Sequence, residues 1–311
     1  MRTQNHTPAT AALALAAGVI ALAALAPTAP AQERPRQTPA DLLAQMQLER
    51  DVEYGRVGNL ALLMDTVRPR ERPSAPMPAI VWVHGGAWSG GAKEGGILRL
   101  LPFAQDGYFG ASVAYRLSGE ATWPAQIQDC KCAVRYLRAH ARELHIDPDR
   151  IGAWGASAGG HLVALLGTTA GAPELEGDAG WPEQSSRVQA VCDWYGPTDL
   201  RGLASVDAVA DMLGSGSGLA RRAAQASPLT HVTADDAPFL IMHGTEDGVV
   251  APQQSRALYD ALKAAGVPAR LMMIDGAGHG FRDPRRTFLP VKRFFDRVLK
   301  GVRPAEADEP G

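Results

Sequence analysis

The chain has 311 residues, of which 46% are hydrophobic, so it is long enough to bury one sizeable core without help from metals or disulfides. Its 31 basic residues nearly balance its 33 acidic residues. This balance gives no support for binding to nucleic acid or to anionic lipid, and we expect neither partner.

Residues 1–31 have the features of a secretory signal peptide. The apolar run AALALAAGVIALAALA covers residues 11–26 and is short for a membrane span, and the small residues Ala29 and Ala31 fit an A-x-A cleavage pattern. We therefore expect cleavage after Ala31, export to the periplasm or the exterior, and no stable membrane association. The alternative is an uncleaved anchor on a membrane-tethered scaffold protein, because the basic segment before the run is weak.

Three further segments follow the expected signal peptide. Residues 32–50 are rich in glutamine, proline and charge, and we interpret them as a leader arm with one or two helical turns. Residues 51–301 form the expected folded domain, in which no repeat of 20–50 residues is visible. Residues 302–311, with the sequence VRPAEADEPG, are expected to be a disordered tail.

Within the domain, short apolar runs alternate with amphipathic stretches. Continuous apolar runs are typical of parallel strands that are covered on both faces, so the alternation predicts a doubly wound, mostly parallel α/β sheet. Its ligand crevice should lie beyond the carboxyl ends of the strands. The predicted strands are 60–65, 79–84, 110–115, 150–155, 188–195, 239–244 and 269–275, and the predicted helices are 97–105, 125–144, 158–167, 252–265 and 286–299.

The second predicted strand runs directly into a glycine-rich turn, VWVHGGAW, at residues 81–88. Glycine lets the backbone come close to a ligand, so such a turn suits backbone N–H groups that stabilise an oxyanion. The simpler interpretation is a tight turn without a ligand. We interpret His84 as a structural hydrogen-bonding residue and Trp88 as a wall of the site.

Three cysteines in an exported protein allow at most one intramolecular disulfide. On the helix predicted over 125–144, Cys130 shares the core-facing side with Ile127 and Leu137, whereas Cys132 points about 200° away from it. Cys192 closes the buried-looking run VQAVC. We therefore hypothesise a bridge between Cys130 and Cys192; the alternative is three buried free cysteines that act as small hydrophobic residues.

The stretch WGASAGGH, at residues 154–161, places Ser157 between a predicted strand and a predicted helix. Gly155 and Gly159 flank it at G-x-S-x-G spacing, which is the pattern of a nucleophile elbow. In such a turn the serine is strained, its small neighbours let strand and helix approach, and the helix N-terminus faces the developing negative charge. A chance match to a small-residue loop is the alternative for the motif alone.

A serine hydroxyl is a weak nucleophile at neutral pH, so this interpretation requires a histidine base and an orienting acid. Asp247 and His279 each follow a predicted strand, on the same edge of the sheet as Ser157 and in the order that such a fold requires. Glu246 and Asp275 are competing acids. The competing histidines lie in settings that favour structural roles: His145, His161, His231 and His243.

Several motifs together resemble the α/β-hydrolase carboxylesterases, in particular hormone-sensitive-lipase-like esterases and bifunctional feruloyl and acetylxylan esterases: HGGAW, YRLSG, DPDRIGAWGASAGGHL, CDWYGPTDL, HGTEDGVVAP and GAGHGF. The resemblance covers about residues 59–300. It implies an α/β-hydrolase fold. Residues 170–186 and 200–226 are long segments of the kind that often form functional loops, and we expect them to form a small lid. The implied residues are Ser157 as nucleophile, His279 as base, Asp247 as the acid that orients the base, and an oxyanion hole from Gly85 or Gly86 with Ala158.

One departure from the family pattern concerns the oxyanion hole. HGGAW stands where the fuller pattern is HGGG, which leaves open whether Gly86 or Ala87 donates the second N–H. The implied reaction is acyl transfer from an ester to water through an acyl-enzyme, in which His279 moves the protons and Asp247 fixes its tautomer. We expect no metal or organic cofactor, because the chain lacks H-E-x-x-H, G-x-x-x-x-G-K and a strand-bound G-x-G-x-x-G.

The sequence says less about the substrate than about the reaction. Aromatic residues near the strand ends are candidates for substrate contacts, although such residues are as often plain packing; they are Trp88, Tyr115, Trp194, Tyr195 and Phe281. The resemblance suggests a small-molecule or polysaccharide ester, with an acetyl or feruloyl group. An aryl-formamidase, an exopeptidase and a non-catalytic polysaccharide-binding module are the alternatives, and no feature of the sequence indicates an oligomeric state.

Overall fold

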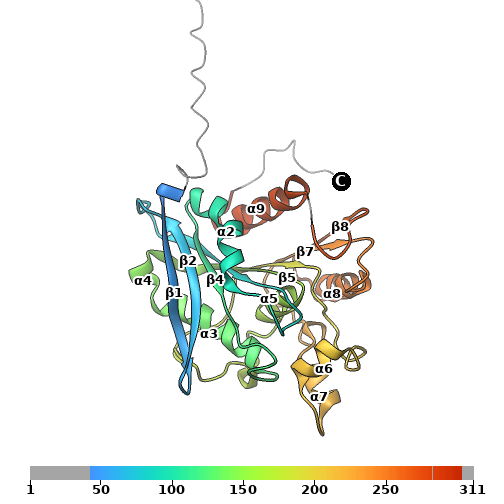
Figure 1. Ribbon diagram of the computed structural model, residues 1–311. Helices are drawn as coiled ribbons and strands as arrows, with labels where there is room; N and C mark the ends of the chain where they lie inside the picture. The colour runs from blue at the N-terminus through green and yellow to red at the C-terminus, as the bar shows by residue number, and fades with distance from the viewer. Residues whose placement is uncertain (1–42, 282, 303–311) are drawn as a thin grey trace, which may run out of the picture. The chain divides into compact units, whose positions relative to one another are not determined.

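The computed structural model describes residues 43–281 and 283–302 (Figure 1). The described part contains an eight-stranded sheet in the order β1-β2-β4-β3-β5-β6-β7-β8. β1 and β2 pair antiparallel, as do β2 and β4, whereas all pairs from β4 to β8 are parallel. The strand bounds are β1 Met46–Val57, β2 Leu60–Pro69, β3 Met77–Val83, β4 Phe109–Val113, β5 Ile146–Ala156, β6 Ala190–Trp194, β7 Phe239–Gly244 and β8 Ala269–Ile274.

Helices cover both faces of this sheet. In Figure 1, α2 and α9 lie on one face, and α3, α5 and α8 lie on the other. The helix bounds are α2 Gly96–Gln105, α3 Ala125–Ala139, α4 Ala141–Leu144, α5 Ala158–Thr168, α6 Asp207–Leu213, α7 Leu219–Gln225, α8 Gln253–Ala264 and α9 Pro284–Lys300, with short 3₁₀ turns η1 Lys93–Gly95, η2 Pro173–Leu175 and η3 Pro228–Thr230. In the residues described here, no helix combines the length and apolar character of a membrane span.

Two hydrophobic cores, one on each face, explain the continuous apolar runs of the central strands. Every residue of β3 is buried, and its side chains alternate between the cores: Val81 packs against the face of α3 and α5, and Ile80 and Trp82 pack against the face of α2 and α9. A strand buried on both faces has no polar side, so its sequence does not alternate. The predicted doubly wound α/β sheet is confirmed.

The predicted elements differ from the structure at the start of the domain and in residues 200–226, where the helices α6 and α7 were not predicted. Residues 46–50, which we expected in a leader arm with helical turns, belong to β1. The first strand lies at the edge of the sheet and many of its side chains face solvent, so it carries charges and has no continuous apolar run. The proposed cleavage site, residues 32–42 of the arm and residues 303–311 of the tail lie outside the described residues.

The proposed disulfide is absent, because Cys130 and Cys192 lie on opposite faces of the sheet. Cys130 is in the core between the sheet and α3, whereas the side chain of Cys192 in β6 points into the core beneath α2 and α9. Cys132, expected to point away from the core, is also buried, with its Sγ 3.6 Å from the carbonyl oxygen of Tyr54 in β1. All three are buried free thiols, as the alternative interpretation held.

Candidate active site

Ser157 occupies a sharp turn between β5 and α5. Its backbone has φ 56° and ψ −120°, a conformation that a residue with a side chain seldom adopts and that surrounding structure must hold in place. The space beside it is small: a Cβ on Gly159 would overlap the carbonyl oxygens of Val83 and His84. Glycine at 159 therefore lets α5 start directly against β3, and this close approach presents the Ser157 hydroxyl above the sheet edge.

The three residues predicted to act together lie within hydrogen-bond distance of one another. Ser157 Oγ is 2.9 Å from His279 Nε2, and His279 Nδ1 is 2.7 Å from Asp247 Oδ2. Ser157 follows β5, Asp247 follows β7 and His279 follows β8, so the carboxyl ends of three parallel strands bring them to one edge. The imidazole is the bridge between the hydroxyl and the carboxylate, which is the arrangement of a base-activated nucleophile.

The carboxylate of Asp247 is fully buried and strongly hydrogen bonded. Its Oδ1 accepts hydrogen bonds from the backbone N–H groups of Val249 at 2.8 Å and Val250 at 2.9 Å. Burial by itself raises the pKa of Asp247, but the hydrogen bonds from His279 and the two N–H groups outweigh it and hold this pKa below its usual range. Asp247 therefore stays ionised at neutral pH and can stabilise a positive charge on His279.

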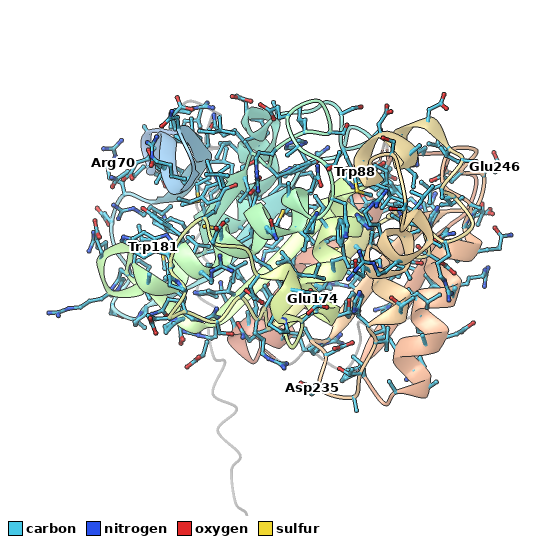
Figure 2. The ribbon with its side chains drawn as sticks, turned by 90° about the horizontal axis from the view of Figure 1, so that it is seen from below. Arg70, Trp88, Glu174, Trp181, Asp235 and Glu246 are labelled. Atoms are coloured by element: carbon cyan, nitrogen blue, oxygen red, sulfur yellow. The ribbon has the colours of Figure 1, made fainter. Side chains whose placement is uncertain are left out.

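His243 also touches this carboxylate, which the sequence did not reveal. Its Nε2 donates to the carbonyl oxygen of Val250 at 2.9 Å and lies 3.1 Å from Asp247 Oδ2, and its Nδ1 accepts from Ser255 Oγ at 2.7 Å. Burial lowers the pKa of His243, so it is a neutral donor that fixes the Asp247 side chain. The competing acid Glu246 is exposed and lies at the margin of the view in Figure 2.

The other histidines have structural contacts. His84 Nδ1 is 2.8 Å from the carbonyl oxygen of Gly85, and its ring stacks on Tyr115. His161 is buried between the indole of Trp88 and the carbonyl oxygen of Ala226, and burial lowers its pKa to about 4. His145 and His231 contact backbone carbonyl oxygens.

A cavity of about 550 Å³ opens over Ser157 and His279. The turn after β3 forms one wall through Gly85, Gly86 and Ala87. None of the N–H groups of Gly85, Gly86 and Ala87 donates to an acceptor in the described chain, and Ala158, at the first position of α5, has no acceptor within its helix either. These N–H groups are therefore available to an oxyanion, and Gly85, Gly86 and Ala87 all stay candidates for the second donor.

Comparison with known proteins places this geometry in a family. The profile of the BD-FAE family matches residues 64–262. The chain belongs to this family. The resemblance stated from the sequence motifs and the predicted α/β-hydrolase fold are both confirmed.

Three similar proteins support the assignment. The chain is 34% identical over 224 residues to "Probable carboxylic ester hydrolase LipM" of Mycobacterium tuberculosis; the match covers 68% of this chain and 51% of LipM, so this chain spans about half of that protein. A structure described as a truncated carbohydrate esterase from gut microbiota has a TM-score of 0.70 at 31% identity, covering 82% and 96% of the two chains. Thermogutta terrifontis esterase 2 phosphorylated by paraoxon has a TM-score of 0.71 at 26% identity, covering 87% and 100%.

The aromatic residues predicted to contact substrate divide into two groups in this BD-FAE family member. Trp88, Tyr115 and Trp194 do not line the cavity. Each is at most 6% exposed and packs in a core, where Trp88 donates to His161 Nδ1 at 3.2 Å and Tyr115 donates to the carbonyl oxygen of His84 at 3.1 Å. Tyr195 does line it, with its ring centroid 4.8 Å from that of His279.

Phe281 lies near His279 but lines a different hollow. It lines a neighbouring cavity of about 580 Å³ that also reaches His279, and its ring packs on Trp194 and Tyr195. The sequence interpretation missed several residues that line the cavity over Ser157. Those with large side chains are Trp82, Arg99 and the 73% exposed Val249. The amphipathic pattern of residues 97–105 indicated a helix, but it gave no sign that one face of this helix borders the site.

Neither of the two expected lid segments lines this cavity. In residues 170–186, Glu176 pairs with Lys131 and Arg135 of α3 at 2.7 Å each, which holds the segment against α3. Trp181 of this segment lies far from Glu246, the neighbour of Asp247 (Figure 2). Residues 200–226 form α6 and α7, a pair of short helices that extends beyond α8 in Figure 1.

Proposed function

We propose that the protein is an exported serine carboxylic-ester hydrolase that works through an acyl-enzyme on short-chain acyl, above all acetyl, or feruloyl esters of carbohydrates. The observation that carries the proposal is the contact of His279 Nε2 with Ser157 Oγ at 2.9 Å while Nδ1 of the same ring bonds to Asp247. A neutral imidazole held in this way has a free acceptor nitrogen directed at the hydroxyl. It can therefore remove the Ser157 proton as the oxygen attacks an ester carbonyl.

The first half of the reaction forms the acyl-enzyme. Ser157 Oγ bonds to the carbonyl carbon, its proton moves to His279 Nε2, and the carbonyl oxygen becomes an oxyanion facing the N–H groups of Ala158 and of the turn at residues 85–87. The imidazolium that results is stabilised by Asp247. It then gives its proton to the alcohol oxygen as the ester C–O bond breaks, and the alcohol leaves.

The second half releases the acid. Water takes the place of the alcohol and gives a proton to His279 Nε2 as its oxygen attacks the acyl carbon. The same oxyanion forms, and its collapse breaks the bond to Ser157 Oγ, which recovers the proton from His279. Because one imidazole serves as base and acid in each half, no further proton donor is needed.

The cavity and the relatives support the substrate class. The wall over Ser157 is made largely of glycine and alanine, which leaves room for a small acyl group, and one similar structure is described as a carbohydrate esterase. Paraoxon phosphorylates another similar protein, as expected of an esterase with an activated nucleophile. Export is proposed from the sequence of residues 1–31 alone.

The test is an ester panel on the wild-type protein and on Ser157→Ala. The panel contains p-nitrophenyl esters of increasing acyl length, acetylated xylan, methyl ferulate and formyl-kynurenine, so that esterase and formamidase activities are separated. A fluorophosphonate probe should add one mass increment to the wild type and to Ser217→Ala, a matched change at an exposed serine between α6 and α7, and none to Ser157→Ala. Absence of both turnover and labelling in the wild type would favour a binding module.

Export and the signal-peptide cleavage site are tested separately. N-terminal sequencing of the protein recovered from the periplasm or medium should begin at Gln32 if cleavage follows Ala31. Residues 1–31 retained on the mature protein would support the tethered alternative and would leave the proposed reaction unaffected.

A further inference from the structure

One side chain in the cavity over Ser157 carries a charge that the proposed reaction does not use. Arg99, on α2, lines the cavity together with Ser157 and His279, and no aspartate or glutamate is among the lining residues. Within the described residues, Arg99 has neither an ion pair nor a hydrogen bond. Most other arginines of the domain do have such a partner; Arg116, for example, is paired with Asp129.

Arg99 is held in place by aromatic rings. Its guanidinium carbon lies 4.8 Å from the ring centroid of Trp82 and 6.0 Å from that of Trp194. A cation over an indole ring is favourable, and such a contact uses none of the hydrogen-bond donors of the guanidinium. Arg99 is thus oriented without losing its capacity to donate hydrogen bonds.

The helix that carries Arg99 is anchored tightly. Gly96 lies three residues before Arg99 and so on the same face of α2, and a Cβ at Gly96 would overlap the side chains of Trp82 and Ser112. The preceding turn is fixed by Lys93, whose Nζ lies 2.9 Å from Asp51 and 3.0 Å from Asp65. The guanidinium position is therefore a property of the packed fold.

We infer that Arg99 forms an anion subsite beside the nucleophile and that the preferred substrate is an ester whose acyl or alcohol part carries a carboxylate. The inference rests on the proposed ester hydrolysis and names its substrate class. A guanidinium binds a carboxylate through two parallel hydrogen bonds, and its single charge matches that of one carboxylate. A phosphate, with nearly two charges at neutral pH, calls for further cations, and Arg99 is the one Lys or Arg among the described lining residues.

The size of the cavity limits where the carboxylate can be. A compact hollow of 550 Å³ is about 10 Å across, so a group bound to Arg99 and a carbonyl at Ser157 Oγ belong to neighbouring parts of one small molecule. A carboxylate a few bonds from the ester fits this spacing. A neutral ester leaves Arg99 solvated and obtains no binding energy from it.

The test compares charged esters with neutral esters of the same shape. On the acyl side, methyl hydrogen succinate is paired with methyl succinamate; on the alcohol side, 3-acetoxypropanoate is paired with 3-acetoxypropanamide. For each pair, kcat/KM is measured by titrating the released acid at pH 7.5, and the ratio of charged to neutral ester is compared between the wild type and Arg99→Gln. For at least one pair we expect Arg99→Gln to lower the ratio by about tenfold or more, the scale of a hydrogen bond to a charged group.

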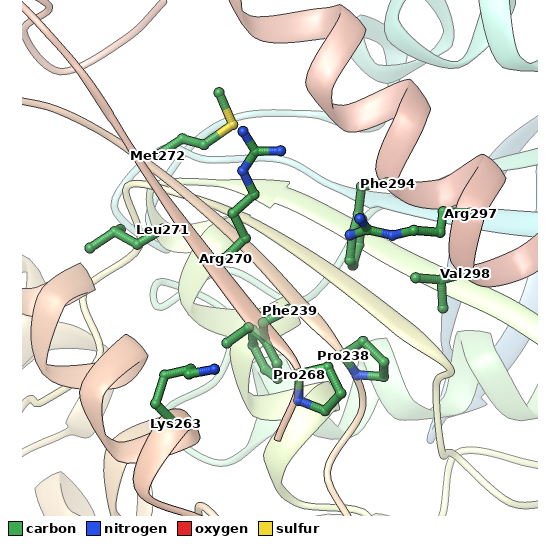
Figure 3. A pocket seen from close by; sticks show the side chains of 11 residues that line it. Pro238, Phe239, Lys263, Pro268, Arg270, Leu271, Met272, Phe294, Arg297 and Val298 are labelled. Carbon is green, nitrogen blue, oxygen red and sulfur yellow. The ribbon is translucent and has the colours of Figure 1, made fainter. Parts of the chain in front are cut away.

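Arg270→Gln is the matched control. Arg270 is also an exposed arginine without an ion pair in the described residues, but it lies near the start of β8, whereas His279 follows the end of that strand. It lines a separate cavity of about 690 Å³ with Lys263 and Arg297 (Figure 3). Arg270→Gln should leave the charged-to-neutral ratio at the wild-type value. Arg99→Lys, which keeps the charge but not the paired donors, should fall between the wild type and Arg99→Gln.

A second measurement needs no variant and covers a loss of folding in Arg99→Gln. Raising the salt concentration on the wild type should lower kcat/KM for the charged ester and leave the neutral ester nearly unchanged. If Arg99→Gln folds and keeps the wild-type ratio of charged to neutral ester, the inference is overturned while the esterase activity stands. If the variant does not fold, a wild-type ratio that stays constant across salt concentrations overturns it. No turnover of any ester by the wild type defeats the proposed function itself.

Discussion

The substitution Asp247→Asn tests whether the buried carboxylate sets the tautomer of His279. Oδ1 of Asp247 accepts two backbone hydrogen bonds, from Val249 and Val250, so the carbonyl oxygen of an asparagine must stay on that side. The amide NH₂ then faces His279 Nδ1, 2.7 Å away in the wild type. An NH₂ group donates, so Nδ1 must accept and the ring proton must move to Nε2. That nitrogen faces Ser157 and can no longer take its proton.

The expected loss is large because the alternative placements are also blocked. A flipped amide would direct its NH₂ at the two backbone N–H donors. Even in the favourable placement, the amide nitrogen takes the position of Oδ2, about 3.1 Å from His243 Nε2, so two N–H donors face each other. Wrong-tautomer histidines in comparable triads lose about 10⁴ in kcat, roughly 5 kcal/mol of transition-state stabilisation. We expect a fall of about 10³ to 10⁴ in kcat/KM for p-nitrophenyl acetate with Asp247→Asn.

Two nearby acids provide the controls for this prediction. Glu246→Gln changes the exposed neighbour of Asp247, and Asp275→Asn changes an acid four residues before His279, 3.5 Å from Thr245 Oγ1. Both should keep kcat/KM within a few-fold of the wild type. A folded Asp247→Asn protein that loses less than tenfold, or an equal loss in Glu246→Gln, would refute the assignment of Asp247 as the residue that orients the base.

Three further outcomes are expected. Ser157→Ala should keep the wild-type fold by circular dichroism and lose several orders of magnitude in turnover, with roughly 10³-fold acceleration over water left from the oxyanion hole; full activity in the folded variant would contradict the nucleophile assignment. Thiol titration of the denatured protein without reductant should find three thiols, and one thiol would show that a disulfide forms. Burial raises the pKa of Asp193 from 3.8 to about 7, so the native state holds a proton that the unfolded chain releases between pH 4 and 7; the free energy of unfolding should therefore fall by on the order of 4 kcal/mol as pH rises through this window. Urea unfolding from pH 4 to 8 should show this slope in the wild type and its loss in Asp193→Asn; equal slopes would contradict it.

The elements that the sequence predicted well are those whose pattern is imposed by the sheet. β3, β5, β6 and β7 are buried on both faces, which leaves continuous apolar runs bounded by turn residues. The elements that were missed have no such sequence pattern. α6 and α7 have seven residues each, too short to be stable alone, and Arg222 of α7 holds the pair by donating to the carbonyl oxygens of Leu213 and Gly214.

The same contrast separates Ser157, Asp247 and His279 from the aromatic residues that were expected to contact substrate. Ser157, Asp247 and His279 each lie in the turn or loop that follows a strand, so knowing the strands and their direction was enough to place them on one edge. The aromatic residues were assigned by nearness to a strand end, but which face a side chain takes depends on its position in the strand. Trp194 is the last residue of β6 and packs among Trp82 and Trp154 in the core under α2, whereas Tyr195, the next residue, reaches the cavity.

His243 and Arg99 have contacts that the sequence could not predict. The role of His243 depends on where the loop after β7 folds back, because its partners are Val250, Ser255 and Asp247 in that loop and the start of α8. Arg99 looks in sequence like any charged residue on the outer face of an amphipathic helix. It borders the nucleophile only because Gly96 lets α2 lie against Trp82 of the preceding strand β3, a packing contact that no motif marks. The sequence is thus enough to place residues that follow predicted strands. A specificity contact that depends on how a helix packs on a strand requires the structure.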